Sequence, residues 1–489
     1  MSTAIRQVQE RTAMHAVSGM LLPVALSLSI GWGIRGNFGH EAGAMIPGAL
    51  AALAAVICSA RPDWHRRCAF FAAFGALGWC LGGSISYMQV IGYTHSGHSP
   101  SVLYGFFCLF VIGFLWGSMG GAGTALPAIL SRQRLMEFIA PLAVWFVTLW
   151  IRDVVEETFV AVDPSFRQND PLYWYDTDWT AALLGLVVFG AFWLARRRDR
   201  ASALLLHMAV GWWMAFLVLV VALHLRMTPP RGDNWAGCLG MALGLLLFLQ
   251  RERLDGAVFA MLTAGFIGGF GFAFAQCVKL LFLLTGWEAN WHSVLEQSYG
   301  LINGIGIAAA MGLLSVRLPR VTEEPPVDRR ADVWAAAFTM LFITYINLRK
   351  NPEQWVKQEA MPASMYWLPT ISWFNVGYAA IAAAVLWLLL QHLRRPLPVL
   401  PAAWLGRAQL LHVLLLWWMV AGNFERALAA FQPQRLITEG VILLNAALVT
   451  ALLLSVRGEP RAEAAPEPAA PLAPLVRRSA VRGMAGMVL

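Results

Sequence analysis

Apolar runs long enough to cross a lipid bilayer recur along the whole chain, separated by short polar or basic segments. About fourteen such runs begin near residues 13, 41, 68, 104, 135, 179, 203, 236, 256, 297, 333, 374, 408 and 436. A helix needs about 20 consecutive apolar residues to span the hydrocarbon core of a bilayer. We therefore predict an all-α polytopic membrane protein with about 14 transmembrane helices.

The composition narrows the choice of function. The chain is 58% hydrophobic and 13% charged, whereas about 25% of the residues in a soluble domain are charged. This excludes a soluble enzyme. The net charge of +8 lies in short basic clusters between apolar runs, a pattern typical of membrane orientation rather than of nucleic-acid binding. We therefore expect no nucleic-acid partner. The six cysteines have no metal-site spacing, and we expect no metal and no cofactor.

Basic residues orient the predicted helices. If the helices alternate in direction, most of the 36 Lys and Arg fall on the side of the N-terminus, and the loop between Arg152 and Asp178 on the other side is acidic. Lys and Arg concentrate in cytoplasmic loops. The pattern predicts a multi-pass protein of the cytoplasmic membrane with both termini in the cytoplasm. After Arg457 the chain is rich in Ala and Pro, which favours an extended, unpacked tail.

Short segments recur along the chain at a nearly constant spacing of 190 to 196 positions. The pairs are Met14–Gly19 with Leu206–Gly211, Arg35–Asn37 with Arg231–Asp233, Gly75–Gly78 with Gly265–Gly268, Tyr104–Gly105 with Tyr299–Gly300, and Tyr173–Trp179 with Tyr366–Trp373. Each unit holds six predicted helices, an even number, so both copies start on the same side and the repeat is parallel. We expect six-helix repeats over 1–198 and 199–396, two more transmembrane helices over 397–456 and the tail over 457–489.

This organisation resembles the major facilitator superfamily, whose two six-helix halves are related by an axis along the membrane normal. The loop Ala60–Arg67 between the second and third predicted helices keeps an acid, Asp63, and two of that family's arginines at altered spacing. The resemblance covers roughly residues 13 to 395. It implies a transport path between the two halves and an alternating-access mechanism.

The densest polar segment is Gly31–Gly43, where the first helix is predicted to end on the outer side. Its five glycines let the backbone approach a ligand closely. Arg35 and Asn37 offer charge and hydrogen bonds, and Arg35-Gly36 recurs in the second half as Arg231-Gly232. We expect the facing copies to form one substrate site that contains Arg35, Asn37, Arg231, Asp233 and Asn234. The alternative is a tight turn followed by a helix start.

Further candidates are polar side chains within the apolar runs. An unpaired polar group costs a few kcal/mol inside a bilayer, so Gln89, Gln276 and Asn303 are added to the substrate site; the alternative for each glutamine is a hydrogen bond between helices. Glu41 and the adjacent His40 are the predicted proton-coupling pair, because partial burial raises the affinity of the Glu41 carboxylate for a proton.

Two functions remain open on these residues. The first is a secondary active transporter of a small polar or anionic solute, such as a sugar or sugar acid, driven by protons. The alternative is a membrane-embedded enzyme that transfers a glycosyl or acyl group at the outer face, with Glu41, His40, Glu156 or Glu157 as acid or base. A central cavity between the halves favours transport, and a lateral groove that ends at Glu41 favours the enzyme. The sequence specifies no substrate, coupling ion or oligomeric state.

Overall fold

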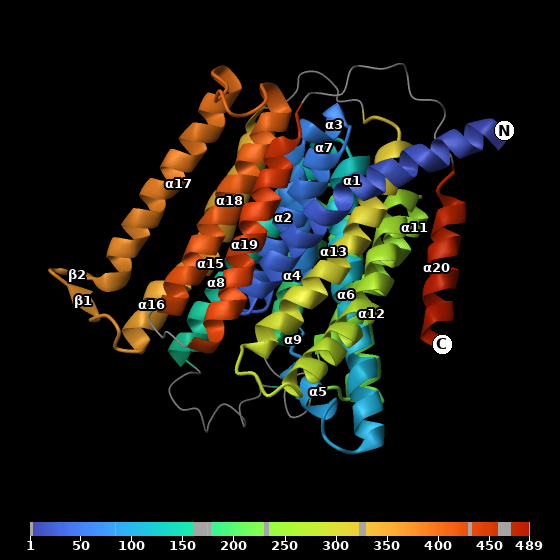
Figure 1. Cartoon of the computed structure of the whole chain (residues 1–489). Coiled ribbons are helices and arrows are strands. Elements are labelled where there is room, and N and C mark those ends of the chain that lie inside the picture. Colours follow the sequence, from blue (N-terminus) through green and yellow to red (C-terminus); the bar gives the residue numbers. More distant parts are fainter. Residues whose placement is uncertain are drawn as a thin grey trace.

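The protein is a bundle of membrane-length helices (Figure 1). The computed structural model describes residues 3–83, 85–159, 174, 178–228, 234–321, 329–428, 433–457 and 471–488. Within these ranges, 12 helices are long and apolar enough to cross a membrane. Strand structure in the same ranges is limited to the hairpin of β1 (Ser364–Met365) and β2 (Leu368–Pro369). The predicted all-α polytopic fold is confirmed.

Each predicted apolar run has a helical counterpart in the described residues. The counterparts are α1 (Thr3–Arg35), α2 (Glu41–Cys58), α4 (Cys68–Gly82), α6 (Ser99–Ile129), α8 (Ile139–Phe159), α9 (Asp178–Ala195), α10 (Arg200–Ala215) with η2 (Phe216–Ala222), α11 (Asn234–Arg251), α12 (Asp255–Leu283), α13 (Trp291–Arg317), α14 (Arg329–Ala337) with η3 (Phe338–Phe342) and α15 (Ile343–Leu348), α17 (Thr370–Arg394), α18 (Ala403–Leu428) and α19 (Pro433–Ser455). Short helices α3 (Pro62–His65), α5 (Met88–Tyr93), α7 (Arg132–Met136) and α16 (Lys350–Lys357) lie in the connections. The counterparts outside the 12 spans are α4 and α11.

The centre of the bundle is built from helices rich in small residues. α1, α2, α4 and α6 pack in chain order, and α12 and α13 close against α6 and α1. A Cβ atom at Gly48 would lie 2.5 Å from the carbonyl oxygen of Gly75, so α2 and α4 touch through their backbones. In a bilayer the hydrophobic effect does not drive helices together, and the van der Waals packing that such close approach permits stabilises their association instead.

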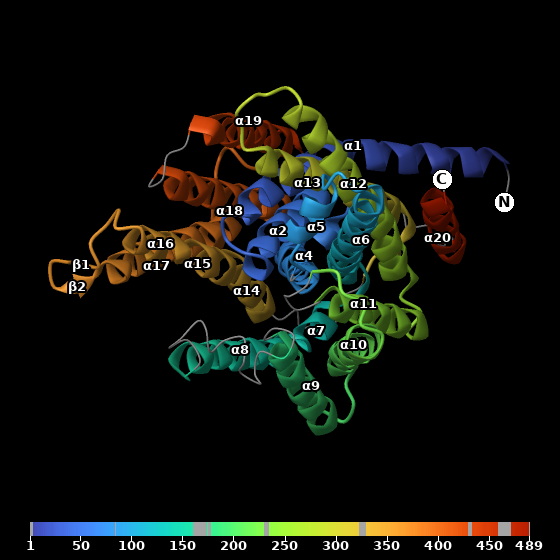
Figure 2. The same ribbon diagram turned by 90° about the horizontal axis from the view of Figure 1, so that it is seen from below.

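The outer helices have a different environment. α8, α9 and α17 stand at the edge of the bundle when it is viewed along its axis (Figure 2). Few of their residues are buried although the helices are strongly apolar. An apolar helix with little protein contact is suited to face lipid. These three helices therefore form the lipid-facing rim.

The two predicted repeats correspond to α1–α9 and to α10–α17. They meet where α6 packs on α12 and where α1 packs on α13. α3 and α7 lie at one end of the bundle and α5 at the opposite end (Figure 1). The parallel superposition of the two repeats stays a prediction.

The end of the chain differs from the sequence-based expectation of an extended tail. Residues 458–470 lie outside the described residues, but Ala473–Val488 forms a helix, α20. It packs on α12, where the Thr263 and Ser479 hydroxyls are 3.1 Å apart. Pro474 stands in the first turn, where proline is tolerated, and the following Leu, Val, Arg, Ala and Met favour a helix. The expectation is therefore wrong for this part of the tail.

Asp63 ties three helix ends together at the end of the bundle that carries α3 and α7. Its carboxylate accepts from Arg61 Nε at 2.8 Å, from Arg67 Nη2 at 3.2 Å and from the Val321 backbone amide at 3.3 Å. Arg61 also donates to the carbonyl oxygens of Ser315, Leu318 and Pro319. The loop that resembles the superfamily motif thus clamps α2 and α4 to the end of α13.

Removal of the Asp63 charge tests this clamp. Burial raises the pKa of the Asp63 carboxyl, but the hydrogen bonds and charges of Arg61 and Arg67 outweigh it and hold the pKa below its ordinary value. The resulting stability is present above the unfolded-state pKa and is lost as the pH falls through the folded-state pKa. D63N should cost about 1–3 kcal/mol at neutral pH, and the difference from the parent should shrink in acid.

Thermal unfolding of the purified protein across a pH series measures both effects. D255N is the matched control, because Asp255 lies at the same end and forms no ion pair within the described residues. A loss in D63N that stays constant with pH would contradict the clamp.

Candidate functional site

Arg35 ends α1 inside the protein. Its side chain is fully buried, at 1% exposure, and the guanidinium lies 4.6 Å from the ring centre of Trp32 and 4.9 Å from that of Trp116. Arginine stays protonated, so a buried one needs a compensating charge and acceptors for its five N–H groups. The aromatic faces supply part of that compensation.

The counter-charge comes from α13. Arg35 Nη1 lies 3.4 Å from Glu296 Oε1, and Glu296 is itself buried. The same carboxylate oxygen accepts the hydroxyl of Tyr87 at 2.5 Å. A Cβ atom at Gly36 would lie 2.7 Å from Glu296 Oε2, which explains a glycine at this position. The pair joins the end of α1 to α13 and thus connects the two predicted repeats.

His40 completes the surroundings of Arg35. Arg35 Nη2 lies 3.2 Å from His40 Nδ1 and also donates to the Gly83 carbonyl at 3.2 Å. Because arginine has no acceptor, His40 Nδ1 must accept. His40 directly precedes Glu41, so the predicted coupling pair adjoins the buried ion pair. Glu296 was not among the residues predicted from the sequence; its signal was a carboxylate within the apolar run Trp291–Arg317.

Asn37 connects the same segment to the last two membrane helices. Its Nδ2 donates to Asn423 Oδ1 of α18 at 2.5 Å, and its Oδ1 accepts from Arg435 of α19 at 2.7 Å. Asn423 in turn donates to the buried Glu439. The two helices beyond the predicted repeats therefore pack against the most polar segment of the chain.

Two other predicted site residues have hydrogen-bond partners outside the predicted site. Gln276 Nε2 donates to Thr94 Oγ1 at 2.8 Å, which matches the alternative of a bond between segments. Asn303 donates to the Tyr299 hydroxyl on its own helix at 2.8 Å. Gln89 is a partly buried residue of α5. Arg231 and Asp233 lie outside the described residues.

A cavity of about 600 Å³ lies beside the Arg35 cluster, between helices of both predicted repeats. α2, α4, α8 and α9 form one part of its wall, and α10, α11, α15 and α16 form the other. Glu41 and Asn234, which come from the corresponding segments of the two repeats, both line it. The described lining does not include Arg35, Asn37, Gln89, Gln276 or Asn303.

Two cations that face this cavity form no ion pair with the described residues. Arg349 and Lys350 line it at the junction of α15 and α16. Neither has a carboxylate within ion-pair distance among the described residues, whereas Arg152 in the same lining pairs with Asp153. Lys350 Nζ donates to the Phe38 carbonyl, which fixes its position next to the polar segment. Neither cation was predicted as a site residue from the sequence. Two basic residues at a helix end are typical of a membrane interface and do not by themselves indicate a site.

Glu41 is the matching acid. It lines the cavity, is exposed, and forms no hydrogen bond with the described residues. The cavity lining therefore holds three cations, Arg152, Arg349 and Lys350, and three carboxylates, Glu41, Asp153 and Asp178. Arg152 and Asp153 pair with each other, whereas Arg349, Lys350 and Glu41 form no ion pair with the described residues. Such a site is suited to an anion and a proton rather than to a neutral solute.

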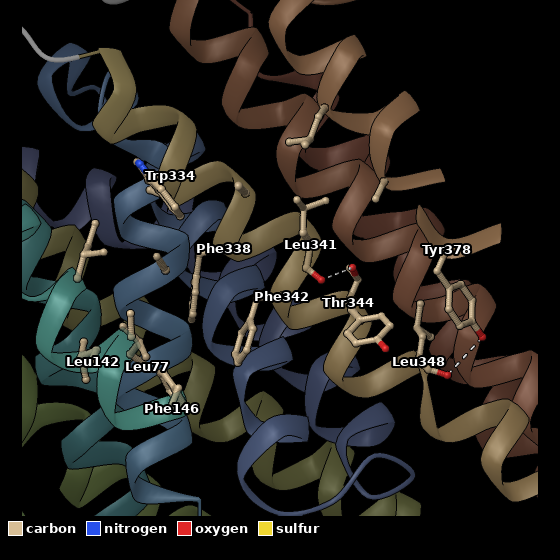
Figure 3. A pocket seen from close by; sticks show the side chains of 18 of the residues that line it. Leu77, Leu142, Phe146, Trp334, Phe338, Leu341, Phe342, Thr344, Leu348 and Tyr378 are labelled. Atoms are coloured by element: carbon tan, nitrogen blue, oxygen red, sulfur yellow. Dashed lines mark hydrogen bonds between the residues drawn. The ribbon is translucent and has the colours of Figure 1, made fainter. Parts of the chain in front are cut away.

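An apolar groove of about 800 Å³ adjoins the charged cavity. Its walls are α4 and α8 on one side and α14, η3, α15, α17 and α18 on the other (Figure 3). The groove and the cavity share the lining residues Leu142, Phe146, Val147, Phe342 and Tyr345. The two spaces are therefore adjacent, and Phe146 and Phe342, whose ring centres are 5.4 Å apart, lie at their boundary.

No family model, curated protein or solved structure matches the chain.

The buried ion pair gives a direct stability prediction. E296Q leaves the Arg35 charge buried without a counter-charge, and breaking a buried pair in this way costs about 3–5 kcal/mol. The midpoint of thermal unfolding in detergent should fall sharply. E288Q, which changes an exposed Glu near the start of the same helix, should change it little. Equal melting of E296Q and the parent would show that the pair does not hold the bundle together.

Proposed function

We propose that the protein is a proton-driven secondary transporter of an anionic solute. It works by alternating access between the two six-helix units, as the likeness to the major facilitator superfamily implies. The observation that carries the proposal is the pair Arg349 and Lys350, without carboxylate partners, in a cavity lined by both units. A transport path between two units is the arrangement expected for such carriers.

The charges of the cavity couple the solute to a proton. A guanidinium at Arg349 and an ammonium at Lys350 hold a carboxylate or phosphate by charge-assisted hydrogen bonds. An ionised Glu41 in the same cavity repels that anion, and a protonated Glu41 does not. Anion and proton therefore bind together, which makes the transporter a symporter.

Arg35 and Asn37 support this site. Their hydrogen bonds go to Glu296, His40, Asn423 and Arg435 in the present conformation. We assign them the task of fixing the segment that carries Glu41, with Asn234 on the opposite wall. In the orientation predicted from the basic loops, with both termini in the cytoplasm, the charged cavity lies toward the outer face.

A second candidate is the membrane-embedded enzyme. The observation that favours it is the lateral apolar groove, which leads to the cavity that contains Glu41. An enzyme returns a chemically changed substrate, whereas a transporter returns the same molecule on the other side. Mass spectrometry of the solute after turnover separates the two.

Binding and transport of organic anions test the proposal. Gluconate, glucuronate and lactate are added to the purified protein and thermal stabilisation is recorded; anions that bind are then tested in proteoliposomes. At least one should raise the melting temperature, and R349Q and K350Q should abolish the effect. K357Q is the matched control, since Lys357 is an exposed cation on α16 outside the cavity.

The coupling role of Glu41 has its own readout. E41Q should keep anion binding and exchange but lose accumulation driven by a pH gradient, because the glutamine cannot carry the proton. Accumulation by E41Q equal to that of the parent contradicts the coupling. Absence of stabilisation by all three anions contradicts the proposal for small sugar-acid and hydroxy-acid solutes.

A further inference from the structure

We infer that the substrate is an anionic amphiphile with one long hydrocarbon chain, which enters from the bilayer. Its chain lies in the apolar groove and its headgroup binds Arg349 and Lys350. The inference rests on the proposed function and specifies its class of substrate.

The groove has the dimensions of a hydrocarbon-chain site. It extends along α14, η3 and α15 from Trp334 to Leu348. At a rise of 1.5 Å per residue this is about 20 Å, somewhat more than half of the bilayer's hydrocarbon core of about 30 Å. Phe338 and Phe342 of the π-helical segment η3 stack at 5.2 Å along its wall (Figure 3). Single-turn π segments are frequent at functional sites.

The groove is open toward lipid. Three of its lining residues are largely exposed: Trp334 at 62%, Val147 at 54% and Tyr345 at 44%. Its outer walls are α8 and α17, two of the lipid-facing helices (Figure 2). A hydrocarbon chain in the bilayer therefore reaches the groove sideways without crossing water.

The positive charges of Arg349 and Lys350 favour a negatively charged headgroup. Tyr345, which lines both spaces, stands one helical turn before Arg349, so the apolar wall passes directly into the cationic site. A neutral lipid would leave Arg349 and Lys350 without a partner at ion-pair distance. A small polar anion would leave the groove unused. An anion that carries a hydrocarbon chain fits both spaces at once.

Photo-crosslinking in lipid nanodiscs tests the inference. The probe is palmitate with a diazirine on its chain, and labelled peptides are identified by mass spectrometry. Labelling should concentrate on α14–α15 and α17 and should be competed by palmitate but not by hexadecanol. K350Q should lower it about tenfold, the loss expected when a charge-assisted hydrogen bond is removed.

A matched pair of variants on α17 examines the groove itself. Ala382 lines the groove, whereas Ala384 is exposed on the opposite face of the same helix. A382F should fill the groove and reduce labelling about tenfold, and A384F should leave labelling unchanged. Neither alanine is fully buried, and a melting curve of each variant shows whether it still folds.

The outcomes separate this inference from the proposed function. Labelling that hexadecanol competes equally, or that K350Q and A382F do not change, shows annular lipid only and overturns the inference. Gluconate binding that depends on Lys350, without palmitate labelling of the groove, also overturns it but leaves transport intact. Labelling that depends on Lys350 without movement of palmitate across proteoliposomes supports the substrate class and contradicts transport.

Discussion

The permanent positive charge of Arg35, buried in the middle of a membrane protein, is the constraint on which the rest of the structure depends. A guanidinium cannot lose its proton, so the fold has to bring a carboxylate, carbonyl acceptors and aromatic faces to it. Glu296 supplies the charge from a helix 261 positions away in the sequence. Trp32 and Trp116 supply the aromatic faces. The ion pair thereby holds α1 against α13, where the two predicted repeats meet.

The charged cavity follows from this fixed point. Arg35 binds His40, and the next residue, Glu41, starts α2 at the cavity wall. Gly39, with φ of 98°, lies in the turn between Arg35 and Glu41, and a Cβ atom at Gly39 would lie 3.1 Å from Lys350 Nζ. The polar segment that encloses Arg35 thus also sets the distance between the accessible acid and the cations of α15 and α16. A movement of α13 relative to α1 would change both sites together.

The sequence predicts the fold better than it predicts the site. The apolar runs predicted the order of the helices, because the need to satisfy every backbone hydrogen bond in lipid leaves little choice but helices. They predicted about 14 spans, whereas 12 helices of the described residues are long and apolar enough to cross a membrane. Of the predicted site residues, Glu41 and Asn234 line the charged cavity, and Arg35 and Asn37 lie beside it. Glu296 was not predicted because its partner, Arg35, is distant in the sequence. Arg349 and Lys350 were not predicted because a sequence does not show that a cation lacks an ion-pair partner. The tail helix α20 was missed because the Ala and Pro composition of the whole segment hid a short run of helix-forming residues.

Distance measurements between spin labels test most directly the central claim that the two units open and close around the cavity. One pair of labels joins Asp153 and Glu353 near the charged cavity, and a second pair joins Gln133 and Arg253 at the opposite end, with the exposed Cys277 replaced by Ser. Addition of gluconate or palmitate should shorten the first distance and lengthen the second. Distances that do not change, or that change in the same direction at both ends, would contradict alternating access.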